Sequence, residues 1–271
     1  MELPFVVAGG NVNVMKKLLL ISGAILIFAS NSLFAIAVTV NGMDNIFEAG
    51  LGVNPGVVGP NLGFYPKSID IQGGALISFN SITGTSKYGG NVADPNVSPD
   101  GVAFGTGAPG TATNITSSTG ISGITFSGRA MFLVGVFLTG SSSAVQPGSI
   151  TFVSGSGGYD PDGRQDWFTD LAESFPVGQA FYIGDGKTGF NNAAGATQVW
   201  RATAEATRLF LGFADGGSGG PFVGLFGAYN DNSGDLTVNI TQGLAAVPEP
   251  GTVLLMGLGL LGVGLLRKRL A

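Results

Sequence analysis

The chain contains no cysteine and no histidine in 271 residues, and only 11% of its residues are charged. Without cysteine it has no disulfide, no thiol nucleophile and no zinc–thiolate site. Without histidine it lacks the commonest general base and transition-metal ligand, so a Ser-His-Asp triad is excluded. The formal net charge of −5 argues against a nucleic-acid partner, because such binding requires a basic surface.

Glycine, by contrast, is abundant, with 47 residues spread along the chain. This composition, with short apolar stretches separated by turn signals, predicts an all-β protein built as a two-sheet jelly-roll sandwich. One short helix is expected at 166–175 (DWFTDLAESF), where Asp166 can cap the first turn. Strands are expected at residues 38–41, 68–71, 75–82, 124–126, 131–138, 181–183, 198–202, 209–213 and 236–240.

Two of these stretches carry further expectations. The continuous apolar run 131–138 (MFLVGVFL) is too short to span a membrane and is typical of a strand buried on both faces. Residues 84–123 are rich in Gly, Ser, Thr, Asn and Pro, so they are expected to form a long surface loop.

The N-terminal region has the three parts of a secretory signal peptide at residues 15–37. Lys16 and Lys17 precede the apolar run LLLISGAILIF, and Ala35-Ile36-Ala37 supplies small residues at the two positions that a signal peptidase reads. Translation is expected to start at Met15, so residues 1–14 are a misassigned start or a disordered extension. Cleavage after Ala37 or Ala35 would remove this signal helix and release an exported protein.

The C-terminus, residues 247–271, combines a proline elbow, an apolar run and a basic end. These features predict a transmembrane helix with a cytoplasmic stop. Their order closely resembles the PEP-CTERM sorting signal of exported proteins of Gram-negative bacteria. That resemblance implies transient anchoring in the inner membrane, an exosortase partner, and a final place at the cell surface or in an extracellular exopolysaccharide or biofilm matrix. The residues that carry the resemblance are Pro248, Glu249, Pro250, Arg267, Lys268 and Arg269.

The stretch 207–241 contains the strongest candidate site. Its apolar residues alternate with other residues in 209–213 and again in 236–240, which predicts a pair of half-buried strands. Asp215 follows the expected strand 209–213, and Asp231 and Asn232 precede the expected strand 236–240, so their side chains can converge at one end of a strand pair. Carboxylate, amide and carbonyl oxygens are the ligands that suit Ca²⁺. The alternative is that Asp-Asn-Ser-Gly is only a turn, because these residues favour turns without any metal.

The same stretch resembles the PA-I-type galactophilic lectins, through the AYNDNSGDLTVNI sequence and through Ser86-Lys87-Tyr88-Gly89. This resemblance implies a galactose-binding-like jelly roll over residues 38–246, and a single Ca²⁺. The calcium ligands that it implies are Tyr88, Asp215, Ala228, Asp231 and Asn232.

The resemblance also implies that the sugar binds through Ca²⁺, next to Asp215, Asp231 and Asn232. The lectins have a sugar-contacting histidine that this chain lacks, and Ser98, Pro99 and Asp100 take roughly its place. The loop between Asp215 and Tyr229 is longer than in the lectins. Large aromatic residues such as Trp167, Trp200 and Tyr229 are expected to pack in the core.

The leading function is therefore non-enzymatic, Ca²⁺-dependent binding of carbohydrate or exopolysaccharide by an exported protein. A structural matrix protein of the same fold without sugar binding is the alternative. A hydrolase that uses a carboxylate pair, either Asp160 and Asp162 or Asp94 and Asp100, ranks below both. Aspartates in Pro- and Gly-rich loops more often form turns than catalytic pairs.

Overall fold

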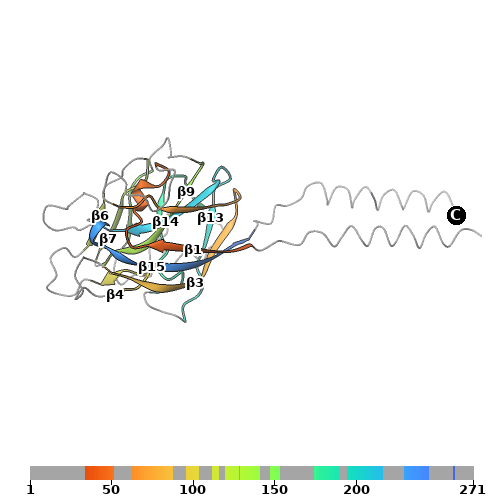
Figure 1. The fold of residues 1–271 in the computed structure, drawn as a ribbon. Helices are drawn as coiled ribbons and strands as arrows, with labels where there is room; N and C mark the ends of the chain where they lie inside the picture. Colours follow the sequence, from red (N-terminus) through yellow and green to blue (C-terminus); the bar gives the residue numbers. More distant parts are fainter. Residues whose placement is uncertain are drawn as a thin grey trace, which may run out of the picture. The chain divides into compact units, whose positions relative to one another are not determined.

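The structure is a computed structural model of the whole chain (Figure 1). It describes residues 34–51, 63–87, 96–103, 112–115, 120–127, 129–140, 147–152, 174–189, 194–215, 229–243 and 259. All of them belong to Leu33–Ala271, one of the two compact units into which the chain divides. The described part is almost entirely β-structure, with short 3-10 turns at η1 (Ile46–Glu48) and η3 (Tyr229–Asp231), so the predicted all-β class is confirmed.

Two larger sheets form the body of the protein. The first has the order β1-β15-β3-β13-β11, and β4 also pairs with β3. Its strands are β1 (Phe34–Asn41), β3 (Leu76–Lys87), β4 (Asn96–Val97), β11 (Ser174–Phe175), β13 (Val199–Ala202) and β15 (Ser233–Gly243). The second has the order β12-β9-β14-β2. Its strands are β2 (Lys67–Asp70), β9 (Phe132–Leu138), β12 (Ala180–Tyr182) and β14 (Arg208–Ala214).

Two smaller sheets complete the described strands. One has the order β10-β7-β6 and the other pairs β5 with β8. Their strands are β5 (Val102–Ala103), β6 (Ala112–Ile115), β7 (Ile124–Ser127), β8 (Arg129–Ala130) and β10 (Ile150–Phe152). Strands β4, β5 and β6 lie within residues 84–123, and Val97 and Ile121 there are buried. The predicted surface loop is therefore wrong over its described residues, because isolated apolar residues between glycines are enough to attach short strands to the core.

The long ladder β1-β15-β3 shows how the apolar pattern directs the fold. In β15, Leu236, Val238 and Ile240 are buried while the residues between them face outward, as the alternation predicted. β15 pairs antiparallel with β1 from Phe34↔Gln242 to Asn41↔Asp235. The first and last described residues of this sheet therefore meet at the same end of the ladder.

A β-bulge explains why β3 does not alternate cleanly. Its partner β15 passes from Asn239, opposite Ser81, directly to Ile240, opposite Phe79, so that Asn80 is the extra residue. Ile77 and Phe79 point into the core before the bulge, whereas after it the partly buried Ile82 packs there. The extra residue thus shifts the inward side of the strand by one position.

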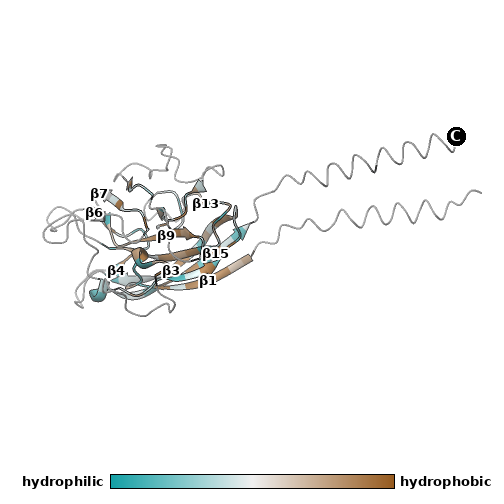
Figure 2. Cartoon of the chain, turned by 90° about the horizontal axis from the view of Figure 1, so that it is seen from above, coloured by the Kyte–Doolittle hydropathy of each residue, from teal (hydrophilic) through white to brown (hydrophobic). Residues whose placement is uncertain are grey.

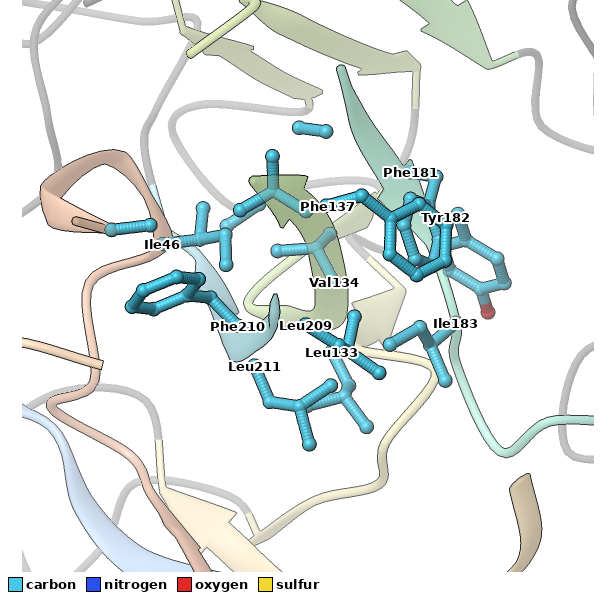
Figure 3. Packing of buried hydrophobic residues seen from close by; sticks show 14 of the residues in the cluster. Ile46, Leu133, Val134, Phe137, Phe181, Tyr182, Ile183, Leu209, Phe210 and Leu211 are labelled. Atoms are coloured by element: carbon cyan, nitrogen blue, oxygen red, sulfur yellow. The ribbon is translucent and has the colours of Figure 1, made fainter. Parts of the chain in front are cut away.

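β9 and β14 lie side by side and are buried on both faces. Every residue of β9 is buried, which confirms the prediction from its continuous apolar run. β14 was expected to be half-buried and to pair with the strand that became β15. Both expectations are wrong: β14 pairs with β9 and β2, and its outer face is covered by the η1 region, where Gly212 lies against the backbone of Asp44 and Ile46. Figure 3 shows Ile46 and Phe210 on the same side of these strands.

Aromatic side chains join the two larger sheets. The Phe181 ring of β12 lies 4.9 Å from Phe175 and 6.0 Å from Trp200, which both belong to the other sheet. Phe137 lies 4.9 Å from the same Phe181 ring, as Figure 3 shows. Trp200 is fully buried, so its predicted place in the core is confirmed. Figure 2 shows the apolar strands such as β9 in brown, lying within the body of the protein.

The predicted helix at 166–175 is tested only at its end. Ser174 and Phe175 form strand β11, so the helix prediction is wrong for these two residues. Phe175 is held there by its contact with Phe181, and this tertiary contact outweighs the helical spacing of the local sequence. Residues 166–173, including Trp167, lie outside the described residues.

The two predicted terminal segments also lie outside the described residues, apart from Phe34–Ala37 and Gly259. Within β1 the core begins at Val38, because Phe34 is 57% exposed while Val38 is 9% exposed. Among the residues that the structure describes, no helix has the length and apolar character to cross a membrane. The signal peptide and its cleavage point stay predictions.

Candidate metal centre

Asp215 emerges from the end of β14 and is almost completely buried, with 4% of its surface exposed. The Tyr229 hydroxyl accepts a hydrogen bond from the Asp215 backbone N–H at 3.1 Å and donates one to the Phe213 carbonyl at 2.9 Å. Tyr229 therefore packs in the core, as predicted, and joins η3 to the last residues of β14. These contacts keep Asp215 close to the residues that follow Tyr229.

Asn232 contacts Asp215 directly. Its Nδ2 atom donates a hydrogen bond of 2.7 Å to Asp215 Oδ2, and Asn232 is itself only 4% exposed. The other amide oxygen, Asn232 Oδ1, is buried and has no hydrogen-bond partner among the residues that the structure describes. A buried oxygen without a partner is costly, so a ligand that accepts its lone pairs would stabilise this arrangement.

The electrostatic surroundings of Asp215 also favour a cation. Burial raises the pKa of the Asp215 carboxyl to about 6, the hydrogen bond from Asn232 opposes this rise, and the charge of Asp231 adds to it. Asp231 is the exposed last residue of η3, next to Asn232. A bound cation would compensate both carboxylates at once.

The strand register brings the second predicted segment to the same place. Ser233, which follows Asn232, pairs with Lys87, which precedes Tyr88. Lys87 pairs on its other side with Asn96 of β4, only two residues before Ser98. The end of β3 therefore lies beside Ser233 and Asn232, and the end of β4 lies on the far side of β3. Tyr88 and Ala228 lie outside the described residues, so their roles as ligands stay predictions.

Ser98, Pro99 and Asp100 form a turn next to this region. The Leu133 N–H donates to the Pro99 carbonyl at 2.8 Å, and Phe132, the preceding residue of β9, pairs with Ala214. The Leu133 carbonyl accepts from the Ile183 N–H, so Leu133 faces β12, whereas β14 lies on the other side of β9. The turn and Asp215 thus lie at the same beginning of β9, on opposite sides of the strand. Ser98 is half-buried, but Pro99 and Asp100 are buried, and a direct contact of Asp100 with sugar stays a prediction.

Asp100 belongs to a second polar cluster that the sequence did not reveal. Its Oδ1 atom accepts hydrogen bonds from the Tyr182 hydroxyl at 2.6 Å and from the Asp185 backbone N–H at 2.9 Å. Burial, with the nearby Asp100 charge, raises the pKa of Asp185 to about 6 and holds the pKa of Tyr182 well above its usual value. Asp185 stands between two glycines after a strand, but no spacing in the sequence connects it to Asp100.

A third buried polar group, Asp44, supports β14. The Phe213 N–H donates to the Asp44 carbonyl at 2.8 Å, and the Asn41 N–H donates to Asp44 Oδ2 at 2.8 Å. Burial raises the pKa of the Asp44 carboxyl to about 7, although the Asn41 N–H and Lys67 oppose the rise. This aspartate was also missed, because nothing in the sequence Asn-Gly-Met-Asp-Asn distinguishes a buried carboxylate from a turn former.

The donor set around Asp215 has the chemistry that Ca²⁺ prefers. Among the described residues, no three acidic side chains are grouped closely enough to hold a metal by themselves. A metal here would need amide and carbonyl oxygens in addition to Asp215 and Asp231, and Ca²⁺ accepts such a mixture of oxygen ligands. Asn232 Oδ1 is the described oxygen best suited to complete it. The pairs Asp160–Asp162 and Asp94–Asp100 are not tested, because Asp94, Asp160 and Asp162 lie outside the described residues.

Comparison with known protein families matches residues 246–269 to the PEP-CTERM protein-sorting motif. The sorting signal predicted for the C-terminus is therefore confirmed. It indicates an exported protein that is held in the membrane before processing and is sorted by an exosortase. No curated protein and no solved structure matches the chain significantly, so these comparisons give no support to the resemblance to PA-I-type lectins.

Proposed function

We propose that the exported domain binds one Ca²⁺ and, through it, carbohydrate of an extracellular matrix, without enzymatic activity. The observation that carries the proposal is the Asp215–Asn232 pair, in which a buried carboxylate with a raised pKa meets a buried amide that leaves Asn232 Oδ1 without a partner among the described residues. When bound, Ca²⁺ would supply positive charge and open coordination positions for two neighbouring sugar hydroxyls.

The chain's own residues would orient the ligand in this proposal. Asp215 and Asn232, fixed by Tyr229, form the buried side of the site, and Asp231 forms its exposed side. The predicted ligand Tyr88 follows β3 in the chain, and β3 pairs with Ser233 next to Asn232. The predicted sugar contact Ser98 follows β4, which pairs with the end of β3. This assignment uses the ligand set that the resemblance to the calcium-dependent lectins implies.

Calorimetric unfolding of the full-length protein in detergent, with Ca²⁺ and with a chelator, tests the ion site. Saturation at about 100 times the Kd should stabilise the fold by about 2.7 kcal/mol. Asp215→Ala and Asn232→Ala should remove this calcium-dependent rise in Tm. Asp70→Ala is the matched control, because the Asp70 side chain on β2 is 97% exposed. Equal Tm values with and without chelator in the wild-type protein would refute the proposal.

A glycan array probed in Ca²⁺ and in chelator tests the sugar. Binding that requires Ca²⁺ and disappears in Asp215→Ala is expected. The alternative, a structural matrix protein, is favoured by the burial of Asp215 and Asn232, because a buried ion can stabilise a fold without offering open positions. Calcium-dependent stability without binding to any glycan would support that alternative instead.

A further inference from the structure

Residues Ser98 to Gly101 form a tight turn across the beginning of β9 from the candidate metal centre. The Gly101 N–H donates to the Ser98 carbonyl at 2.9 Å, and Gly101 has a φ of 81°, which glycine adopts without strain. A side chain at Gly101 would lie 2.5 Å from the Ala130 carbonyl oxygen. The turn is thus pressed closely against the chain that leads into β9.

The side chain of Asp100 points away from solvent and holds this turn through hydrogen bonds within the protein. Asp100 is 1% exposed, and the Tyr182 hydroxyl and the Asp185 N–H, the two donors to its Oδ1 atom, both come from β12 or the residues just after it. Tyr182 is also 1% exposed. Hydrogen bonds to a buried carboxylate are stronger than those between neutral groups, so this contact fixes the turn firmly to β12.

The backbone of the turn is held by β8 and by Met131, the residue between β8 and β9. Arg129 Nη1 donates to the Asp100 carbonyl at 2.9 Å and to the Gly101 carbonyl at 3.3 Å. Within the same segment, the Met131 N–H donates to the Ala214 carbonyl at 2.9 Å, directly before Asp215. Met131 is buried and has a φ of 51°, a conformation that costs free energy for a residue with a side chain. One strained segment therefore contacts both the turn and the end of β14.

We infer that Asp100, together with Tyr182 and Arg129, positions the Ser98–Gly101 turn as a rigid wall of the carbohydrate site and does not itself contact the sugar. This inference rests on the proposed function. With Asp100 withdrawn into the protein, Ser98 is the residue of this turn that offers a polar side chain to a ligand. Such a wall suits neutral sugar hydroxyls, and it acts on sugar affinity without acting on calcium affinity.

Conservative and disruptive variants separate positioning from direct contact. Asp100→Asn keeps an oxygen that can accept from Tyr182 and Asp185 but removes the charge. Asp100→Ala removes the acceptor, and Tyr182→Phe removes one donor at a residue too buried to touch a ligand. We expect Asp100→Asn to keep sugar affinity within about threefold, and the other two variants to lose about fivefold or more, which is the loss of at least one buried hydrogen bond.

The experiment uses the full-length protein in detergent, isothermal titration with Ca²⁺ alone, and an array of neutral mono- and disaccharides that includes D-galactose. Unchanged calcium affinity in all three variants, with sugar binding weakened in Asp100→Ala and Tyr182→Phe only, would support the inference. Hydrogen exchange of the peptide over residues 96–103 should quicken in those two variants.

Two other outcomes would overturn the inference while leaving the proposed function in place. If Asp100→Asn lost sugar binding as fully as Asp100→Ala while exchange stayed slow, Asp100 would be a direct ligand. Tyr182→Phe keeps the Asp100 carboxylate and so disturbs folding less than Asp100→Ala. If Tyr182→Phe bound sugar as tightly as the wild-type protein, the turn would not depend on the contact between Tyr182 and Asp100. Calcium binding by the wild-type protein without any glycan binding would instead refute the proposed function, and the inference with it.

Discussion

The Tyr229 hydroxyl offers the sharpest test of how the metal centre is built. Tyr229→Phe removes one oxygen from a fully buried ring, and it leaves the Asp215 N–H and one interaction of the Phe213 carbonyl without their partner. Buried polar groups that lose their partners cost about 1–3 kcal/mol each, so we expect a loss of about 2–3 kcal/mol in the free energy of unfolding. For a domain of this size roughly 2–4 °C is lost per kcal/mol, which predicts a fall in Tm of about 5–10 °C.

Calorimetry in the presence of chelator measures this loss without any contribution from bound ions. Tyr65→Phe is the matched control, because Tyr65 is half-buried and its hydroxyl has no hydrogen bond among the described residues. It should change the free energy of unfolding by less than about 0.5 kcal/mol. A Tyr229→Phe protein as stable as Tyr65→Phe would show that the hydroxyl contacts do not hold η3 to β14, and the geometric basis of the ion site would be lost.

Two further predictions concern other buried groups. The pKa of the Asp44 carboxyl is about 7 in the folded protein against an ordinary 3.8, so its contribution to stability is present below about pH 4 and is lost as the pH rises to 7. Asp44→Asn should therefore flatten this part of the pH dependence in urea unfolding at pH 5 and 8, and an unchanged slope would contradict the assignment. Gly184→Ala would bring a side chain within 2.2 Å of Asp100 Oδ1, whereas at Gly74, which also has a positive φ, nothing lies within 4 Å of the added atom. Urea unfolding should show a loss above about 2 kcal/mol for Gly184→Ala and only about 1 kcal/mol for Gly74→Ala, and equal losses would disprove the predicted clash.

Local sequence patterns predicted which faces of a strand are buried, where the pattern within that one strand was enough to decide this. The alternation in 236–240 and the unbroken apolar run in 131–138 each define which faces are buried, and β15 and β9 follow them. The sandwich partners of β14 could not be predicted in this way. The outer face of β14 is covered by the η1 region, but its sequence differs little from that of a strand whose outer face meets solvent. Phe210 is one of the few residues that distinguish the two cases.

The candidate site was predicted by the types of its residues more than by their spacing. Asp215 and Asn232 are 17 residues apart, with a glycine-rich loop between them, yet their side chains meet at 2.7 Å. Turn chemistry alone could not distinguish them from Asp100, which also stands before a glycine but is bound to Tyr182, 82 residues away. Contacts of such long separation depend on the packing of the sheets, and a single sequence does not encode them in any local pattern.

The pairing of Phe34 with Gln242 has a consequence for how the protein works while it is still attached. The sorting motif begins at residue 246, so the tether departs from the Gln242 end of β15, and Asn232 stands just beyond the opposite end. Eleven residues of extended strand separate them, about 35 Å at the usual rise per residue. If the proposed function holds, attachment and ligand binding would therefore use opposite ends of β15, and the domain could bind its ligand before the exosortase has processed its tail.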